Sequence, residues 1–87
     1  MDLGNRIAEP LAKSLRHEML HVSVVHVPER EEDHYFRYEI DVDNLEPVLV
    51  ELSTLEVIES NGDDQRKVQM LRHKFYEQLA RGEFGSA

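Results

Sequence analysis

The sequence has no cysteine, which excludes disulfide bonds and metal sites built on thiolates. It also has no apolar run near the roughly 20 residues that a membrane-spanning helix requires. Its first residues lack the continuous apolar segment of a signal peptide. Neither a glycine-rich phosphate loop nor a G-x-S-x-G nucleophile elbow is present. We therefore expect a cytoplasmic protein with no membrane segment and no common motif of nucleotide binding or serine hydrolysis.

The composition is that of an ordinary globular domain. Of the 87 residues, 40% are hydrophobic and 32% are charged, close to the average for such domains. A chain of this length can bury one modest core. No repeat, low-complexity tract or Gly/Ser linker divides it. The sequence thus predicts a single compact domain over residues 1–82 and a flexible tail at 83–87, which resembles a cloning scar.

The net charge of −8 is concentrated in the middle of the chain. Residues 17–62 contain twelve acidic residues against two arginines, a sum of −10, whereas residues 1–16 and 63–87 each sum to +1. An acidic centre repels nucleic-acid phosphates and attracts basic surfaces. The charge pattern therefore disfavours nucleic acid as a partner. It favours either a basic protein partner or a solvated acidic face that keeps the protein in solution.

Hydrophobic spacing at the start of the chain predicts an amphipathic helix. Apolar residues recur every four positions and so share one side of a helix. Pro10 interrupts this pattern, because a proline inside a helix removes a hydrogen bond and clashes with the preceding turn. A helix over 9–19, with the proline in its first turn, is the prediction, and a longer helix kinked at the proline is the alternative. The stripe consists of Leu3, Ile7, Leu11, Leu15 and Met19.

Two stretches predict β-strands. Residues 20–27 are rich in β-branched side chains, and residues 34–43 alternate regularly between apolar and charged side chains. The proline and charges of residues 28–33 predict an exposed turn between them. In the second stretch the apolar face comprises Phe36, Tyr38, Ile40 and Val42.

Residues 45–60 fit two patterns. Read as a strand, Val48, Val50 and Leu52 share a face, and the alternation slips near Ser53 in the way that a bulge or a break produces. Read as a helix, the segment has a different apolar stripe, which Asn44 could cap and which consists of Leu45, Val48, Leu49, Leu52 and Leu55. We favour the strand.

The last part of the chain predicts a turn and a second helix. Asn61-Gly62-Asp63 is typical of a turn that also caps a helix, and Gly82 is a typical helix stop. The whole chain then has the order α-β-β-β-α. We expect an α+β domain in which two helices cover one face of a three-stranded antiparallel meander. If 45–60 is helical, a β-hairpin with three helices is the alternative. The helical stripe is Val68, Leu71, Phe75 and Leu79.

Residues 17–21, HEMLH, resemble the H-E-x-x-H motif of zinc peptidases. In that motif two histidines on one helical face bind zinc, and the glutamate is the general base toward a metal-bound water. The resemblance implies His17 and His21 as ligands, Glu18 as the base, and His34 as the third ligand. However, the strand pattern that begins near Leu20 predicts that the helix ends within the motif and separates the two imidazoles.

The sequence also departs from the peptidase families that carry this motif. Metzincins have a glycine and a third histidine where this chain has Val24 and Val27. In SprT-type peptidases the third histidine lies further along the chain; His34 is the one candidate, and Tyr35 follows it in place of a glycine. We expect no cofactor, with zinc as the alternative.

The α-β-β-β-α order over residues 9–82 resembles that of double-stranded RNA-binding domains. That resemblance implies a lysine cluster at the start of the second helix, which grips phosphate. Residues 63–67 instead read Asp-Asp-Gln-Arg-Lys. The resemblance therefore implies a protein-docking member of such a topology and not an RNA-binding one.

We predict a non-enzymatic protein-interaction or regulatory module with an acidic sheet face suited to a basic protein partner. The alternative is a minimal zinc-dependent hydrolase that uses HEMLH. We also expect that a second copy of the chain could be the partner, because the basic face of the last helix in one copy could meet the acidic sheet face of the other. The predicted interaction residues are Tyr35, Glu39, Asp41 and Asp43 on the sheet, with Glu51 beside them, and Arg66, Lys67, Arg72 and Lys74 on the last helix.

Overall fold

The computed structural model describes residues 3–19, 21–27, 36–43 and 45–81. These form a three-stranded antiparallel sheet and three helices in the order α-β-β-β-α-α, which confirms the predicted α+β class. Tyr35, His34 and the 83–87 tail lie outside the described residues. In chain order the elements are α1 (Leu3–Arg16), β1 (Val22–His26), β2 (Arg37–Val42), β3 (Val48–Glu51), α2 (Thr54–Ser60) and α3 (Asp64–Ala80).

The sheet is the predicted meander, with strand order β1-β2-β3. The register pairs Val24 with Ile40 in the first hairpin and Ile40 with Val48 in the second. Because side chains alternate between the two faces of a strand, one row of the sheet is apolar and points toward the helices. The neighbouring row, which pairs Val25 with Glu39 and Glu39 with Leu49, points the other way.

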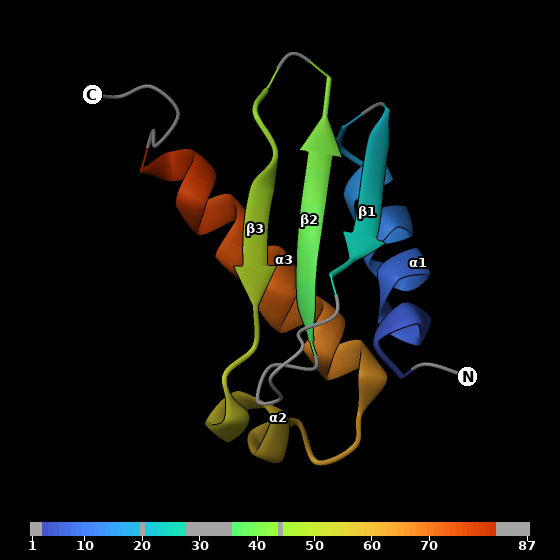
Figure 1. Cartoon of the computed structure of the whole chain (residues 1–87), viewed down its shortest axis with the longest axis vertical. Coiled ribbons are helices and arrows are strands. Elements are labelled where there is room, and N and C mark those ends of the chain that lie inside the picture. The colour runs from blue at the N-terminus through green and yellow to red at the C-terminus, as the bar shows by residue number, and fades with distance from the viewer. Residues whose placement is uncertain (1–2, 20, 28–35, 44, 82–87) are drawn as a thin grey trace.

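Both long helices lie on the same side of the sheet (Figure 1). Helix α1 packs against β1, α3 packs against β3, and the two helices pack against each other. Their apolar stripes and the inner row of the sheet form one continuous core. No helix in the described ranges is both long and apolar enough to cross a membrane. The core consists of Ile7, Leu11, Leu15, Val22, Phe36, Tyr38, Ile40, Val48, Val50, Leu52, Val68, Leu71 and Phe75.

Helix α1 begins six residues earlier than the predicted range of 9–19 and ends three residues earlier. Pro10 therefore lies inside the helix and not in its first turn. Contacts on the N-terminal side of the proline explain why the helix continues through it. Ile7 is buried in the core, and the Arg6 guanidinium lies 2.6 Å from the Asp64 carboxylate at the start of α3. These contacts thus compensate for the stability lost with the backbone hydrogen bond that the proline removes.

Residues 45–60 contain both a strand and a helix, so the preference for a strand throughout was wrong in its second half. The pattern slip at Ser53 is the boundary, because Ser53 is the N-cap of α2. Its hydroxyl accepts the Glu56 N–H, and the Glu56 carboxylate accepts the Ser53 N–H at 2.8 Å. This reciprocal pair is a capping box, and its Ser-x-x-Glu spacing was present in the sequence.

Glu56 also joins α2 to α3, because its carboxylate lies 3.0 Å from the Lys74 ammonium. Burial would raise the pKa of Glu56, but the Ser53 N–H and the Lys74 charge outweigh it and hold that pKa below its ordinary value. The carboxylate is therefore charged in neutral solution, and α2 is fastened both at its first turn and to its neighbour.

A tight turn of two left-handed residues connects α2 and α3. Asn61 has φ of 53° and Gly62 has φ of 78°, a conformation that suits asparagine and glycine best. Asp63 then caps α3, because its carboxylate accepts the N–H groups of Gln65 and Arg66. The predicted turn and cap are confirmed.

Candidate functional site

The HEMLH segment lies in the connection between α1 and β1. Helix α1 ends at Arg16, and His21 has a left-handed backbone with φ of 57°. His17 and His21 therefore do not share a helical face, the arrangement through which this motif binds zinc. Within the described residues no three histidine, aspartate or glutamate side chains are grouped to hold a metal ion. His34, the third predicted ligand, lies outside the described residues.

Glu18, the residue that the peptidase motif would make a general base, fastens this connection to α3. Its carboxylate accepts the Tyr76 hydroxyl at 2.7 Å and the Arg72 guanidinium at 3.0 Å. The Arg72 guanidinium in turn lies 5.3 Å from the centre of the Tyr76 ring, within the range of a cation–π contact. The carboxylate therefore has a clear structural role.

This contact makes a testable prediction about Tyr76. Burial, together with the hydrogen bond and negative charge of Glu18, raises the pKa of Tyr76, and Arg72 opposes this only in part. We expect Glu18→Gln to lower the pKa of Tyr76 and to cost about 0–1 kcal/mol of stability, as for other exposed ion pairs. Ultraviolet titration, referenced to Tyr76→Phe in each background, measures the change.

The raised pKa of Tyr76 also determines how this residue's contribution to the stability of the fold depends on pH. The folded pKa of Tyr76 lies above the unfolded value of about 10, so its contribution to stability is complete below that pH. It is lost as the pH rises through the folded pKa. An unchanged Tyr76 pKa in Glu18→Gln would show that the carboxylate does not reach the phenol in solution.

The outer face of the sheet is covered by no described helix, since α1 and α3 both lie on the inner face (Figure 1). Val25 and Leu49 are 52% and 47% exposed there. Glu39 stands between them, because it pairs with Val25 on one side and with Leu49 on the other. Neighbouring strands lie about 4.8 Å apart, so the two apolar side chains flank a carboxylate within about 10 Å.

The remaining predicted acidic residues lie on or beside this face. Asp41 pairs with Ser23 in the next outward row, and Asp43 is exposed just past the end of β2. Glu51 faces Arg37 across the strands, with 3.6 Å between carboxylate and guanidinium. The structure therefore brings Glu39 and Asp41 together on one surface. We call Val25, Glu39, Asp41 and Leu49 the outer sheet patch.

The predicted basic residues of α3 do not form one exposed surface. Lys67 is buried, with 5% of its surface exposed, and its ammonium lies 5.4 Å from the centre of the Phe36 ring. Arg72 binds Glu18 and Lys74 binds Glu56, whereas Arg66 is exposed near the start of the helix. Sequence alone could not show this, because the partners of these cations come from distant parts of the chain.

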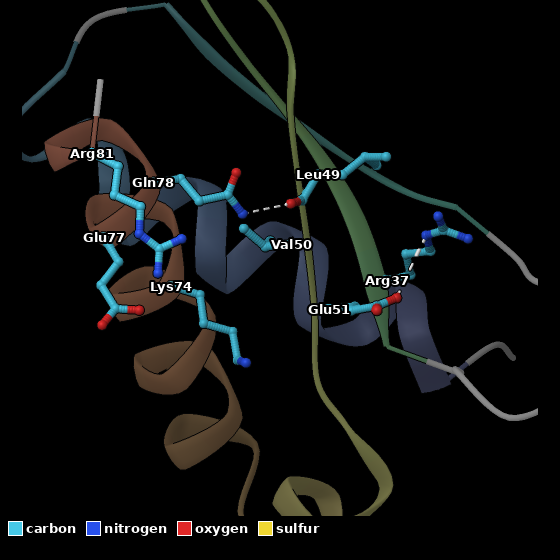
Figure 2. A pocket seen from close by; sticks show the side chains of 8 residues that line it. All are labelled: Arg37, Leu49, Val50, Glu51, Lys74, Glu77, Gln78 and Arg81. Carbon is cyan, nitrogen blue, oxygen red and sulfur yellow. Dashed lines mark hydrogen bonds and ion pairs between the residues drawn. The ribbon is translucent and has the colours of Figure 1, made fainter. Parts of the chain in front are cut away.

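A groove of about 350 Å³ lies between β3 and the C-terminal half of α3. Figure 2 shows Gln78 reaching from the helix to the strand, where its side-chain amide donates to the Leu49 carbonyl at 2.9 Å. No sequence signal marks this groove, because it arises only where α3 passes beneath the edge of the sheet. Its walls are Arg37, Leu49, Val50, Glu51, Lys74, Glu77, Gln78 and Arg81.

Comparison with known proteins does not assign the site. No family model matches the chain, and no curated protein or solved structure is significantly similar to it. Any functional conclusion must therefore come from the chemistry of the surfaces described above.

Proposed function

We propose that this chain is a non-enzymatic interaction module, of the regulatory kind, which binds a basic protein partner through the outer sheet patch. The observation that carries the proposal is the row Val25–Glu39–Leu49, in which two exposed apolar side chains flank a carboxylate. Apolar contacts would contribute affinity there, and the carboxylates would select and steer a partner rich in lysine or arginine.

The charges of the patch favour a different protein over a second copy. If two copies met face to face through this patch, Glu39 and Asp41 of each would approach the same carboxylates of the other. Like charges in an interface oppose association. The basic helix surface that could have met the patch in a head-to-tail dimer is largely occupied, because Arg72 and Lys74 already bind carboxylates within the chain.

The competing readings have less support. A zinc hydrolase would need His17 and His21 to converge, but α1 ends before both. An RNA-binding surface would need free cations at the start of α3, where the Asp63 carboxylate caps the helix and Lys67 is buried. We include a cytoplasmic location in the proposal, since small secreted domains more often carry disulfides and this chain has no cysteine.

Affinity capture with matched variants tests the proposal. The bait is the intact chain, and the captured proteins are purified and titrated against each variant by calorimetry. Glu39→Lys and Val25→Asp should each weaken binding of a basic partner at least tenfold. Glu59→Lys and Ile58→Asp make the same changes at exposed positions of α2 and should leave the affinity within about twofold, as expected for sites outside the interface.

Salt dependence and self-association complete the test. Raising the salt concentration from about 0.05 to about 0.5 M should weaken the complex at least tenfold, because it screens the charges of the patch. Equal binding by wild type and Glu39→Lys would refute the proposed surface. A dimer of the chain alone in sedimentation, lost in Val25→Asp, would replace the basic partner with a second copy.

A further inference from the structure

Asn61 and Gly62, which connect α2 to α3, combine a reactive sequence with an open position. Figure 1 shows this connection at the end of the molecule opposite the connection between β2 and β3. Both residues are exposed, and a Cβ atom built on Gly62 would meet no described atom within 4 Å. Glycine also has no side chain of its own to shield its backbone nitrogen. The side-chain amide of Asn61 is therefore followed by an unhindered nitrogen.

These two groups are the ones that a succinimide requires. The Gly62 nitrogen loses its proton and attacks Cγ of Asn61, which closes a five-membered ring. The bond between Cγ and Nδ2 breaks, and Nδ2 takes up a proton and leaves as ammonia. Water then opens the ring at either of its carbonyls. Opening at Cγ leaves aspartate, whereas opening at the main-chain carbonyl leaves isoaspartate, in which the main chain runs through the former side chain. Water is the one co-reactant.

The folded turn holds these groups apart from their reactive arrangement. Asn61 has φ of 53° and ψ of 42°, and ring closure requires ψ to rotate until the Gly62 nitrogen lies beside Cγ. That rotation moves every residue that follows. It would break the bond from the Asp63 N–H to the Ser60 carbonyl, which is 2.9 Å long. The reaction therefore starts from molecules in which this turn has opened, a local event that does not require global unfolding.

The stability of α2 determines how often the turn opens. This helix has 7 residues, too few to be stable in isolation. Its Leu55 and Ile58 side chains are 63% and 67% exposed, so they contribute little to packing. The capping box at Ser53 and the ion pair of Glu56 with α3 hold the helix in place. Contacts at the first turn of α2 thus protect a reactive residue at its C-terminal end.

We infer that Asn61 is a site of spontaneous deamidation, limited by the opening of α2, and that its product weakens the connection between α2 and α3. Either product adds a negative charge at the C-terminal end of α2, where the helix dipole is already negative. Isoaspartate also adds one methylene to the main chain between Ser60 and Asp63, whose backbone groups are bonded. The inference is independent of the proposed function, because neither Asn61 nor Gly62 belongs to the outer sheet patch.

Prolonged incubation of the intact chain in mildly alkaline buffer, followed by mass spectrometry and peptide mapping, tests the site. The chain should release ammonia and gain about one dalton, and the change should map to Asn61 with isoaspartate as the larger product. Asn61→Gly keeps the left-handed conformation without the amide and should show no gain. Asn5, within α1, and Asn44, which precedes Leu45, are internal controls and should remain amides over the same period.

Ser53→Ala tests whether α2 controls the rate. It removes the side chain that caps α2 and should speed the loss of the Asn61 amide about fivefold, the factor that corresponds to a typical helix cap. Ser23→Ala makes the same change at an exposed position of β1 and should leave the rate unchanged. Isoaspartate-containing chain, separated by ion exchange, should unfold at a lower urea concentration than the unmodified chain. Reaction of Asn61 no faster than Asn44, a wild-type rate in Ser53→Ala, or equal urea midpoints would each contradict the inference.

Discussion

Replacing Phe75 by alanine should lower the free energy of unfolding by about 3–5 kcal/mol, the range for removing a fully buried phenylalanine. Phe75 is 0% exposed and belongs to α3, the helix that packs against α1, α2 and β3. Its ring also meets Tyr76 edge-on, with 5.5 Å between ring centres. The substitution would therefore leave a cavity where the two long helices meet the sheet.

Urea denaturation followed by circular dichroism measures this effect. Domains of this kind have a total stability of about 5–15 kcal/mol, so Phe75→Ala should remove a large fraction of it. Leu55→Ala is the matched control, because Leu55 is 63% exposed on α2 and its truncation should change stability by about 0.5 kcal/mol or less. Similar losses for the two variants would mean that Phe75 is not in the core.

Replacing Pro10 by alanine should raise the free energy of unfolding by about 1–3 kcal/mol. Proline is about 3 kcal/mol less favourable than alanine inside a helix, and Pro10 lies within α1 at an exposed position. Alanine would restore the N–H that bonds to the carbonyl of Arg6, four residues earlier. The greater freedom of the unfolded chain without proline offsets part of this gain.

Thermal and urea unfolding of the two proteins measure the gain, with Pro47→Ala as the control. Pro47 is exposed and lies in the connection ahead of β3, outside any helix. There the substitution acts mainly on the unfolded chain and should cost about 0.4–1 kcal/mol. A loss of stability in Pro10→Ala would mean that the proline ring has a favourable role in α1 that outweighs the missing hydrogen bond.

The helices and strands that bury one face could be predicted from the sequence, and together they gave the correct fold class. The alternation of residues 34–43 predicted β2, and the four-residue spacing around Leu71 and Phe75 predicted α3, because burial on one face imposes these periods. Hydrophobic periodicity did not resolve residues 45–60, because a four-residue strand and a seven-residue helix are each too short to show a clear period. The capping box at Ser53 and Glu56 was the signal that could have divided them.

Neither the start of α1 nor the burial and ion pairing of the basic residues of α3 could be predicted from the sequence. Both depend on contacts between residues that are far apart in the chain. Local preference placed Pro10 in a first turn, but the burial of Ile7 and the bond between Arg6 and Asp64 extend the helix. Likewise, alternation correctly placed Glu39 and Asp41 away from the core. Whether Lys67 and Arg72 remain exposed depends on Phe36 and Glu18, which are remote in the sequence.

The link between Glu18 and Tyr76 also has a consequence for how the chain folds during synthesis. The two residues are 58 positions apart, and α1, which packs on α3, is made first. At about 5–20 residues per second, a ribosome takes roughly 3–12 seconds to cover that distance. Throughout this interval the apolar stripe of α1 has no α3 to pack on. Helix α1 can pack on β1 during this time, but the part of its apolar stripe that contacts α3 stays uncovered until α3 has been synthesised.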